Sequence, residues 1–202
     1  MKKIFMAILA TAAMAMAESH THDGFFLNLA LGLGYQSFTY DANKAIFDLE
    51  SNGVSTELDV KIGGRIFTNT ILHATILGVT NTSEIETKRD GKKLGSTSDI
   101  SENLSILGIG ITYYLPENIF FSGSIGVAQF NLQDNTDEGN AVKGSTEKGF
   151  GVQVAAGKEW WVSDNWGLGA SIAFTYGSAE DQDDYGDASA YGVNIMFSAT
   201  FN

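Results

Sequence analysis

Large apolar residues alternate with small or polar residues along eight segments of the chain, and residues 25–36 show the pattern most clearly. Successive side chains of a β-strand point to opposite faces, so this segment predicts a strand with one oily face and one small or polar face. The oily positions are Phe25, Leu27, Leu29, Leu31, Leu33 and Tyr35. The opposite positions after Phe26 are Asn28, Ala30, Gly32, Gly34 and Gln36.

The same alternation recurs in seven further segments, and each predicts another strand. The third strand is the least regular, and we expect its Ala74 and Gly78 to face inward. The chain has 23 Gly, a single Pro and no useful stretch of helical periodicity, so we expect an all-β fold. The predicted outward residues are, strand by strand, Leu58, Val60, Ile62 and Ile66; Ile71, Thr75, Leu77 and Val79; Leu107, Ile109, Ile111 and Tyr113; Ile119, Phe121, Ile125 and Val127; Phe150, Val152, Val154 and Trp160; Trp166, Leu168, Ile172, Phe174 and Tyr176; and Tyr191, Val193, Ile195, Phe197, Ala199 and Phe201.

Short and long connections between these strands alternate strictly, and this predicts the topology. An up-and-down meander of eight strands places all short turns at one end and all long loops at the other, with both termini at the short-turn end. Short periplasmic turns and long external loops are typical of outer-membrane barrels. The short connections are 68–70, 115–118 and 163–165, and the long polar ones are about 41–54, 85–99, 131–147 and 178–189.

The first seventeen residues have the pattern of a secretory signal peptide. Lys2 and Lys3 precede a short apolar stretch, and Ala15-Met16-Ala17 provides the small residues that a signal peptidase requires. The apolar stretch is too short for a spanning helix, which needs roughly 20 residues. We therefore predict a cleaved signal peptide over 1–17, an N-terminal tail over 18–23 and one barrel domain over 24–202.

Two kinds of barrel fit alternating strands, and the residues opposite the oily face distinguish them. A soluble barrel or sandwich would carry many charged side chains on its water-facing positions. Here those positions hold mostly Gly, Ala, Ser, Asn and Gln, which suit a crowded lumen of eight strands. Aromatic residues also flank the predicted turns and loops, where Trp and Tyr favour the membrane interface. We therefore predict a transmembrane barrel with the oily face toward lipid.

The mature chain resembles the small eight-stranded outer-membrane β-barrel superfamily that includes OmpX and the membrane domain of OmpA. Residues 157–169, which read GKEWWVSDNWGLG, are similar to the penultimate hairpin of many such barrels. The last strand resembles the signal that the family's assembly machinery recognises, although Asn202 follows the usual terminal aromatic residue. The residues that carry this signal are Tyr191, Val193, Ile195, Phe197 and Phe201.

Charge and composition exclude several function classes. Loss of Lys2 and Lys3 with the signal peptide leaves 10 of the 12 basic residues against 24 acidic ones. Nucleic acid is not expected as a partner, because its binding depends on Lys and Arg neutralising phosphates. The chain has no Cys, so neither disulfides nor thiol chemistry is available.

The second strand carries a polar constellation on its inward face. Glu57, Asp59, Lys61 and Arg65 all alternate with lipid-facing residues, so we expect them in the lumen. Glu102 and Glu159 occupy inward positions of other strands and are expected to join them. Buried charges must be paired or hydrogen-bonded. We interpret the set as an ion-pair network that plugs the barrel, and a narrow polar path for small solutes is the alternative.

The three His residues argue against an enzyme. A site that acts on outer-leaflet lipids would need a His as general base near the external loops. We expect His20 and His22 in the tail and His73 after a short turn, all on the periplasmic side. We therefore predict no catalytic residue and no cofactor.

Two further segments raise the possibility of a metal. His20-Thr21-His22-Asp23 contains two imidazoles and a carboxylate, although an exposed flexible tail explains it more simply. The acidic loop 180–187 lacks the bidentate Glu of a Ca²⁺ loop, since Gly192 stands at the twelfth position from Asp181. We predict no metal site.

The sequence leaves two function classes open. The first is a structural or surface-interaction protein with a plugged lumen, and the second is a narrow porin-like channel or transporter for small solutes. In both cases the expected partners are outer-membrane lipids, lipopolysaccharide and the outer-membrane assembly machinery, and the expected state is a monomer.

Overall fold

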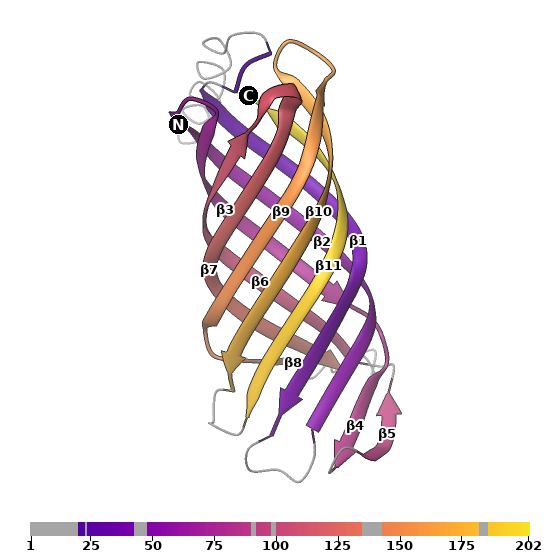
Figure 1. The fold of residues 1–202 in the computed structure, drawn as a ribbon. Coiled ribbons are helices and arrows are strands. Elements are labelled where there is room, and N and C mark those ends of the chain that lie inside the picture. Colours follow the sequence, from indigo (N-terminus) through magenta and orange to yellow (C-terminus); the bar gives the residue numbers. More distant parts are fainter. Residues whose placement is uncertain are drawn as a thin grey trace, which may run out of the picture.

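Eight long antiparallel strands close into a barrel in the computed structural model, which describes residues 20–22, 24–42, 48–89, 92–97, 100–134, 143–181 and 186–202 (Figure 1). Each barrel strand pairs with the next along the chain, and β1 pairs with both β2 and β11, which closes the sheet. The predicted up-and-down barrel is therefore confirmed. Its strands are β1 (Phe25–Asp41), β2 (Asp48–Phe67), β3 (Thr70–Asn81), β6 (Ile100–Tyr114), β7 (Ile119–Asp134), β9 (Gly149–Trp161), β10 (Trp166–Glu180) and β11 (Asp187–Phe201).

The short turns, the start of β1 and the C-terminal end of β11 lie at one end of the barrel, as predicted (Figure 1). Asn69, Glu117 and Asn118 have positive φ angles that tighten two of these turns, and η1 (Pro116–Asn118) forms one of them. Within the described ranges, no helix has the length and hydropathy to cross a membrane. The predicted signal peptide and its cleavage point lie outside the described residues.

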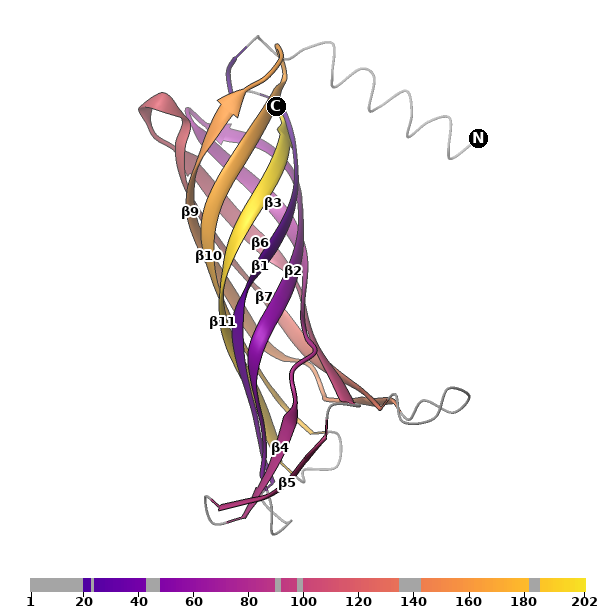
Figure 2. The same ribbon diagram turned by 90° about the vertical axis from the view of Figure 1, so that its right-hand side faces the viewer.

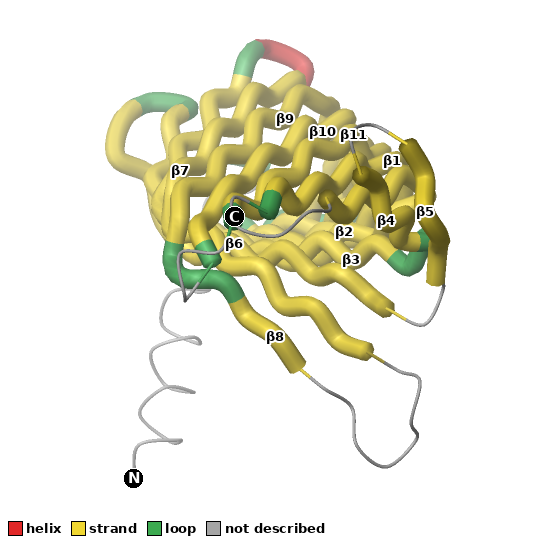
Figure 3. The backbone as a smooth tube through the Cα atoms, turned by 90° about the horizontal axis from the view of Figure 1, so that it is seen from below, coloured by secondary structure: helices red, strands yellow, loops and turns green. Residues whose placement is uncertain are grey.

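The opposite end carries three short strands in addition to the loops, and Figure 2 shows two of them, β4 and β5, beyond the barrel strands. β4 (Ile85–Arg89) and β5 (Lys92–Thr97) form a hairpin within the segment predicted as a loop over 85–99. This hairpin forms because β2 runs past the end of β3, so Asp48–Ser51 offer a free edge to β4. β8 (Lys143–Ser145) pairs with β7 in the same way. Figure 3 shows the strands as a closed ring, with β4 and β5 at its rim.

Exposed apolar side chains form a ring around the barrel, which we call the apolar belt. Outward residues that we predicted for strands other than β3 are exposed or half-buried, apart from Phe201. Phe201 is covered because its ring lies 6.3 Å from that of Phe25 and 5.4 Å from that of Trp166. The belt includes Leu29, Leu31, Leu33, Leu58, Ile62, Leu72, Ile76, Leu107, Ile109, Ile111, Phe121, Ile125, Val127, Phe150, Val154, Leu168, Ile172, Phe174, Val193, Ile195 and Phe197.

The predicted faces of β3 are wrong. Ile71, Thr75, Leu77 and Val79 are buried, whereas Leu72, Ala74, Ile76 and Gly78 face outward. Directly paired residues share a face, and the register pairs outward Val60 with Ile76. Both faces of β3 carry apolar residues, so alternation alone did not distinguish them.

Toward the long-loop end, the outward face of the barrel becomes polar and the inward face becomes apolar. Beyond Tyr35 the outward residues of β1 become Ser37 and Thr39, while the inward residue Phe38 is fully buried. This end therefore has a polar exterior and an apolar interior, like a soluble barrel. We call its interior the outer apolar cluster; it consists of Phe38, Leu77, Val79, Leu104, Ile106, Ala128, Phe130, Ala179, Ala188 and Ala190.

A charge introduced on the outward face of β7 tests where the belt ends. Ile125 lies in the belt, so Ile125→Arg should lower the free energy of unfolding by about 2–4 kcal/mol. Asn131 shares this face beyond the belt, so Asn131→Arg should cost only about 0–1 kcal/mol. The measurement is reversible urea unfolding in lipid vesicles. Equal losses in the two variants would contradict the assigned belt.

Candidate functional site

The middle of the barrel interior holds three charged residues of β2. Glu57, Asp59 and Lys61 alternate with the belt residues Leu58 and Ile62, so the pleat turns all three inward. They are 0%, 1% and 6% exposed, respectively. We call them the central charge cluster.

Polar side chains from three other strands bind this cluster. Gln153 of β9 donates from Nε2 to Glu57 Oε1 at 2.6 Å and to Asp59 Oδ2 at 2.9 Å. Asn194 of β11 donates from Nδ2 to Glu57 Oε2 at 2.7 Å, and Thr175 of β10 donates to the same carboxylate at 3.3 Å. Side chains from four strands therefore meet across the lumen at Glu57.

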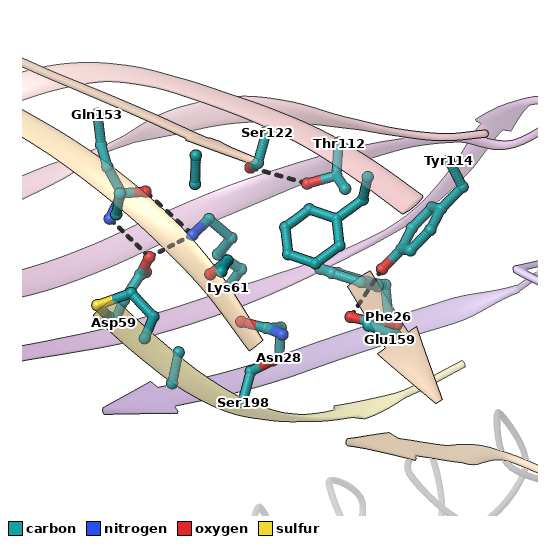
Figure 4. Close-up of a pocket in the computed structure, with 16 residues that line it drawn as sticks. Phe26, Asn28, Asp59, Lys61, Thr112, Tyr114, Ser122, Gln153, Glu159 and Ser198 are labelled. Carbon is teal, nitrogen blue, oxygen red and sulfur yellow. Dashed lines mark hydrogen bonds and ion pairs between the residues drawn. The ribbon is translucent and has the colours of Figure 1, made fainter. Parts of the chain in front are cut away.

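Lys61 supplies the positive charge of the cluster. It forms an ion pair with Asp59 and donates to Gln153 Oε1 at 3.1 Å (Figure 4). Gln153 therefore donates through its nitrogen to the carboxylates and accepts through its oxygen from the ammonium group. A buried charge without such partners would cost several kcal/mol, so this arrangement is what allows the three groups to stay inside.

The fourth residue that we expected in this set lies apart from it. Arg65 is exposed near the short-turn end, where a register shift between Arg65 and Phe67 interrupts the pairing of β2 with β3. The expectation that Arg65 lies in the lumen is therefore corrected: its strand has already reached the rim.

Glu102 and Glu159, which we expected to join the cluster, occupy other levels of the interior. Glu102 lies toward the long-loop end, where Gln36 donates to it at 3.3 Å. Glu159 lies toward the short-turn end and accepts from Thr200 at 2.6 Å and from the Tyr114 hydroxyl at 3.2 Å. The three buried acidic sites are therefore separate.

The tail covers the interior at the short-turn end. The His22 ring stacks on Tyr114 with ring centroids 3.4 Å apart, and its Nε2 lies 3.3 Å from Asn118 Oδ1. The backbone N–H of His20 donates to Asp164 at 3.0 Å. His22 is thus buried against the barrel, which the expectation of an exposed tail does not fit, whereas His20 is exposed; Asp23 lies outside the described residues.

His73 points into the interior and is 2% exposed, although we had placed it only at the rim. Its ring nitrogens lie 3.0 Å from Thr75 Oγ1 and 3.1 Å from Thr112 Oγ1. Among the described residues, no group of three or more His, Cys, Asp or Glu side chains is arranged to hold a metal ion. The neighbours of His73 are hydroxyl groups of the barrel wall.

A cavity of about 20 Å³ lies between the central charge cluster and Glu159 (Figure 4). A volume of this size holds roughly one water molecule. Asp59, Lys61, Tyr114, Glu159 and Ser198 are among the residues that line it.

The residues of the predicted assembly signal lie on β11. Four of them, Tyr191, Val193, Ile195 and Phe197, are exposed on its outward face, and Phe201 is buried.

In the acidic loop over 180–187, Asp181 accepts a hydrogen bond from the Tyr40 hydroxyl at 2.7 Å, and residues 182–185 lie outside the described ranges.

Comparisons with known proteins agree with this architecture. The family model described as outer membrane protein beta-barrel domain matches residues 4–201. The outer membrane protease OmpT from Escherichia coli is similar in fold, with a TM-score of 0.51 and 10% identity over 92% of this chain and 99% of that chain. Such identity shows the fold alone. A comparison with curated sequences gave no match.

Two other solved structures match with lower TM-scores. The outer membrane protein OprG from Pseudomonas aeruginosa has a TM-score of 0.49 and 10% identity, covering 90% of this chain and 98% of that chain. Neisserial surface protein A has a TM-score of 0.46 and 11% identity, covering 86% of this chain and 95% of that chain.

Replacing Lys61, the cation of the central charge cluster, tests how much its ion pair contributes to the stability of the barrel. Lys61→Met leaves Asp59 buried without its ion-pair partner, so the free energy of unfolding should fall by about 3–5 kcal/mol. Asp59→Asn combined with Lys61→Met removes both charges and should recover part of this loss. Arg65→Met is the control and should change the value by no more than about 0.5 kcal/mol. If Arg65→Met costs as much as Lys61→Met, the assigned cluster is wrong.

Contact between the tail and the barrel can be tested with a single thiol, because the chain has no Cys. In Ser198→Cys the thiol lines the cavity behind His22. Adding His22→Ala removes the ring contact, worth about 0.5–1.5 kcal/mol, so labelling by a small thiol reagent should accelerate about two- to tenfold. Ser163→Cys on the exposed turn is the control for intrinsic reactivity. An unchanged labelling rate would show that His22 does not cover the interior.

Proposed function

The chain belongs to the outer membrane protein β-barrel domain family, and we propose that it is an outer-membrane protein with a plugged lumen and a structural or surface-interaction role. The observation that carries the proposal is the central charge cluster. Its carboxylates and ammonium group bind each other and the amides of Gln153 and Asn194. Most of the polar atoms that could bind a passing solute are thus occupied by one another, and Asp59 Oδ1 is the exception within the cluster.

Two further features support closure of the lumen. On the outer side, the outer apolar cluster fills the interior beyond the belt with buried side chains such as Phe38 and Phe130, whose ring centroids lie 5.6 Å apart. On the periplasmic side, His22 stacks on Tyr114. An apolar layer opposes the entry of ions, because an ion there loses its hydration without gaining partners.

The proposed partners follow from the surface of the barrel. The apolar belt suits membrane lipid, and lipopolysaccharide would surround the polar exterior beyond it. Outward residues of β11 such as Tyr191 and Phe197 would serve as the signal for the assembly machinery. We also propose that the signal peptide is cleaved after Ala17 and that the protein acts as a monomer without catalytic activity.

Planar-bilayer recording tests the plugged lumen. Full-length mature protein refolded into a bilayer should show no steady single-channel steps, because the central charge cluster and the outer apolar cluster both obstruct the path. Heat-modifiable migration on gels provides the control that the sample is folded. Reproducible steps from folded protein would instead support the alternative function, a narrow channel for small solutes.

A further inference from the structure

Basic residues are concentrated at one point on the outer side of this acidic protein. The chain has a net charge of −12, yet four of its 12 basic residues fall within residues 88–93. These are Lys88 and Arg89 at the end of β4, and Lys92 and Lys93 at the start of β5. They occupy the tip of the hairpin that extends the wall beyond the barrel rim (Figure 2).

The register of the hairpin brings these cations together in two like-charged pairs. Lys88 lies opposite Lys93, and Arg89 lies opposite Lys92. Directly opposite side chains have Cβ atoms only about 4.5–5.5 Å apart, so like charges at such positions destabilise a hairpin. The two pairs point to opposite faces, because they occupy successive positions of the strands.

Acidic partners neutralise the first pair. Lys88 forms an ion pair with Glu50 of β2, and Lys93 donates to Glu86 at 2.8 Å. The hydrogen bond with Glu50 raises the pKa of Lys88, and the hydrogen bond with Lys93 lowers the pKa of Glu86. This face of the hairpin is therefore electrostatically balanced.

Among the residues that the structure describes, the second pair has no such compensation; Asp90, which lies between the two cations in the sequence, is outside the described ranges. Arg89 and Lys92 are both exposed, and neither forms an ion pair with another described residue. The guanidinium group of Arg binds two oxygens of a phosphate at once, and the ammonium group of Lys adds a point charge. Together they fit one doubly charged phosphate group.

The position of the tip identifies where that phosphate would come from. The apolar belt on β2 ends near Val54, and Arg89 lies about seven residues further along the wall, roughly 15–20 Å beyond the belt. Lipid headgroups occupy only about 5–7 Å on each side of the hydrocarbon. The tip therefore reaches past the headgroups into the polysaccharide layer of the outer leaflet.

We propose that Arg89 and Lys92 form a binding site for the phosphate groups of a surface polysaccharide, of the kind that lipopolysaccharide carries beyond its lipid headgroups. The site deepens the proposed surface-interaction role and rests on it for the outward exposure of the hairpin, but it does not depend on whether the lumen conducts. Binding would relieve the repulsion between the two cations.

The test uses the full mature protein in detergent micelles and a lipid-free, phosphorylated core oligosaccharide as the probe. Arg89→Gln combined with Lys92→Gln should weaken binding about ten- to hundredfold, because charge-assisted hydrogen bonds are lost. The matched control is Lys88→Gln combined with Lys93→Gln, which removes the same charge from the balanced face of the same hairpin. The control should weaken binding by no more than about threefold.

Several outcomes would overturn the proposal. Equal weakening in the two double variants would mean that only net charge matters. Undiminished binding of the dephosphorylated oligosaccharide would exclude phosphate recognition, and equal competition by vesicles containing lipid A would assign the site to headgroups. Absence of binding by folded, non-conducting wild-type protein would refute this site and leave the plugged-lumen proposal standing.

Discussion

Polar groups that point into this barrel depend on partners inside the barrel, and most of them find one, although buried oxygens such as Asp59 Oδ1 and Glu159 Oε2 do not. The outward face is apolar, and the cavity found beside the charged residues holds about 20 Å³. Glu57, Asp59 and Lys61 therefore need Gln153, which reaches them from the opposite wall, and Asn194, which binds Glu57 from β11. This requirement ties the strands together across the lumen, in addition to the backbone pairing that closes the sheet.

The side chains of the interior form successive layers along the barrel axis. The central charge cluster lies between an apolar layer toward the long-loop end and the Tyr114–Glu159 contact toward the short-turn end. Past the belt, the wall no longer faces lipid, so its exterior becomes polar and its interior becomes an ordinary apolar core. The β4–β5 hairpin continues that wall and carries the basic tip away from the membrane.

Strand number, topology and most faces could be predicted from the sequence, because alternation with a period of two and the spacing of turns are local properties. The predicted faces of β3 are wrong because Ile71-Leu72 and Ile76-Leu77 place apolar residues on both faces of the strand. Only the register with β2 shows which of the two faces points outward. Arg65 lies four residues after Lys61 and therefore falls on the same face of the strand. The alternation does not show, however, at which residue the strand reaches the end of the lumen. Gln153 and Asn194 alternate with the predicted outward residues of their strands, so the same pattern gives their inward orientation, but their contact with Glu57 depends on how the strands are staggered around the barrel. That stagger is a long-range property with no local signal.

We propose that side chains binding one another across the interior close the barrel to solutes. Osmotic water permeability of proteoliposomes tests it most directly, since water is the smallest solute that an open path would pass. Stopped-flow light scattering should give the same swelling rate for vesicles with folded protein as for protein-free vesicles of the same lipid. A swelling rate that increases with the amount of folded protein would contradict the account.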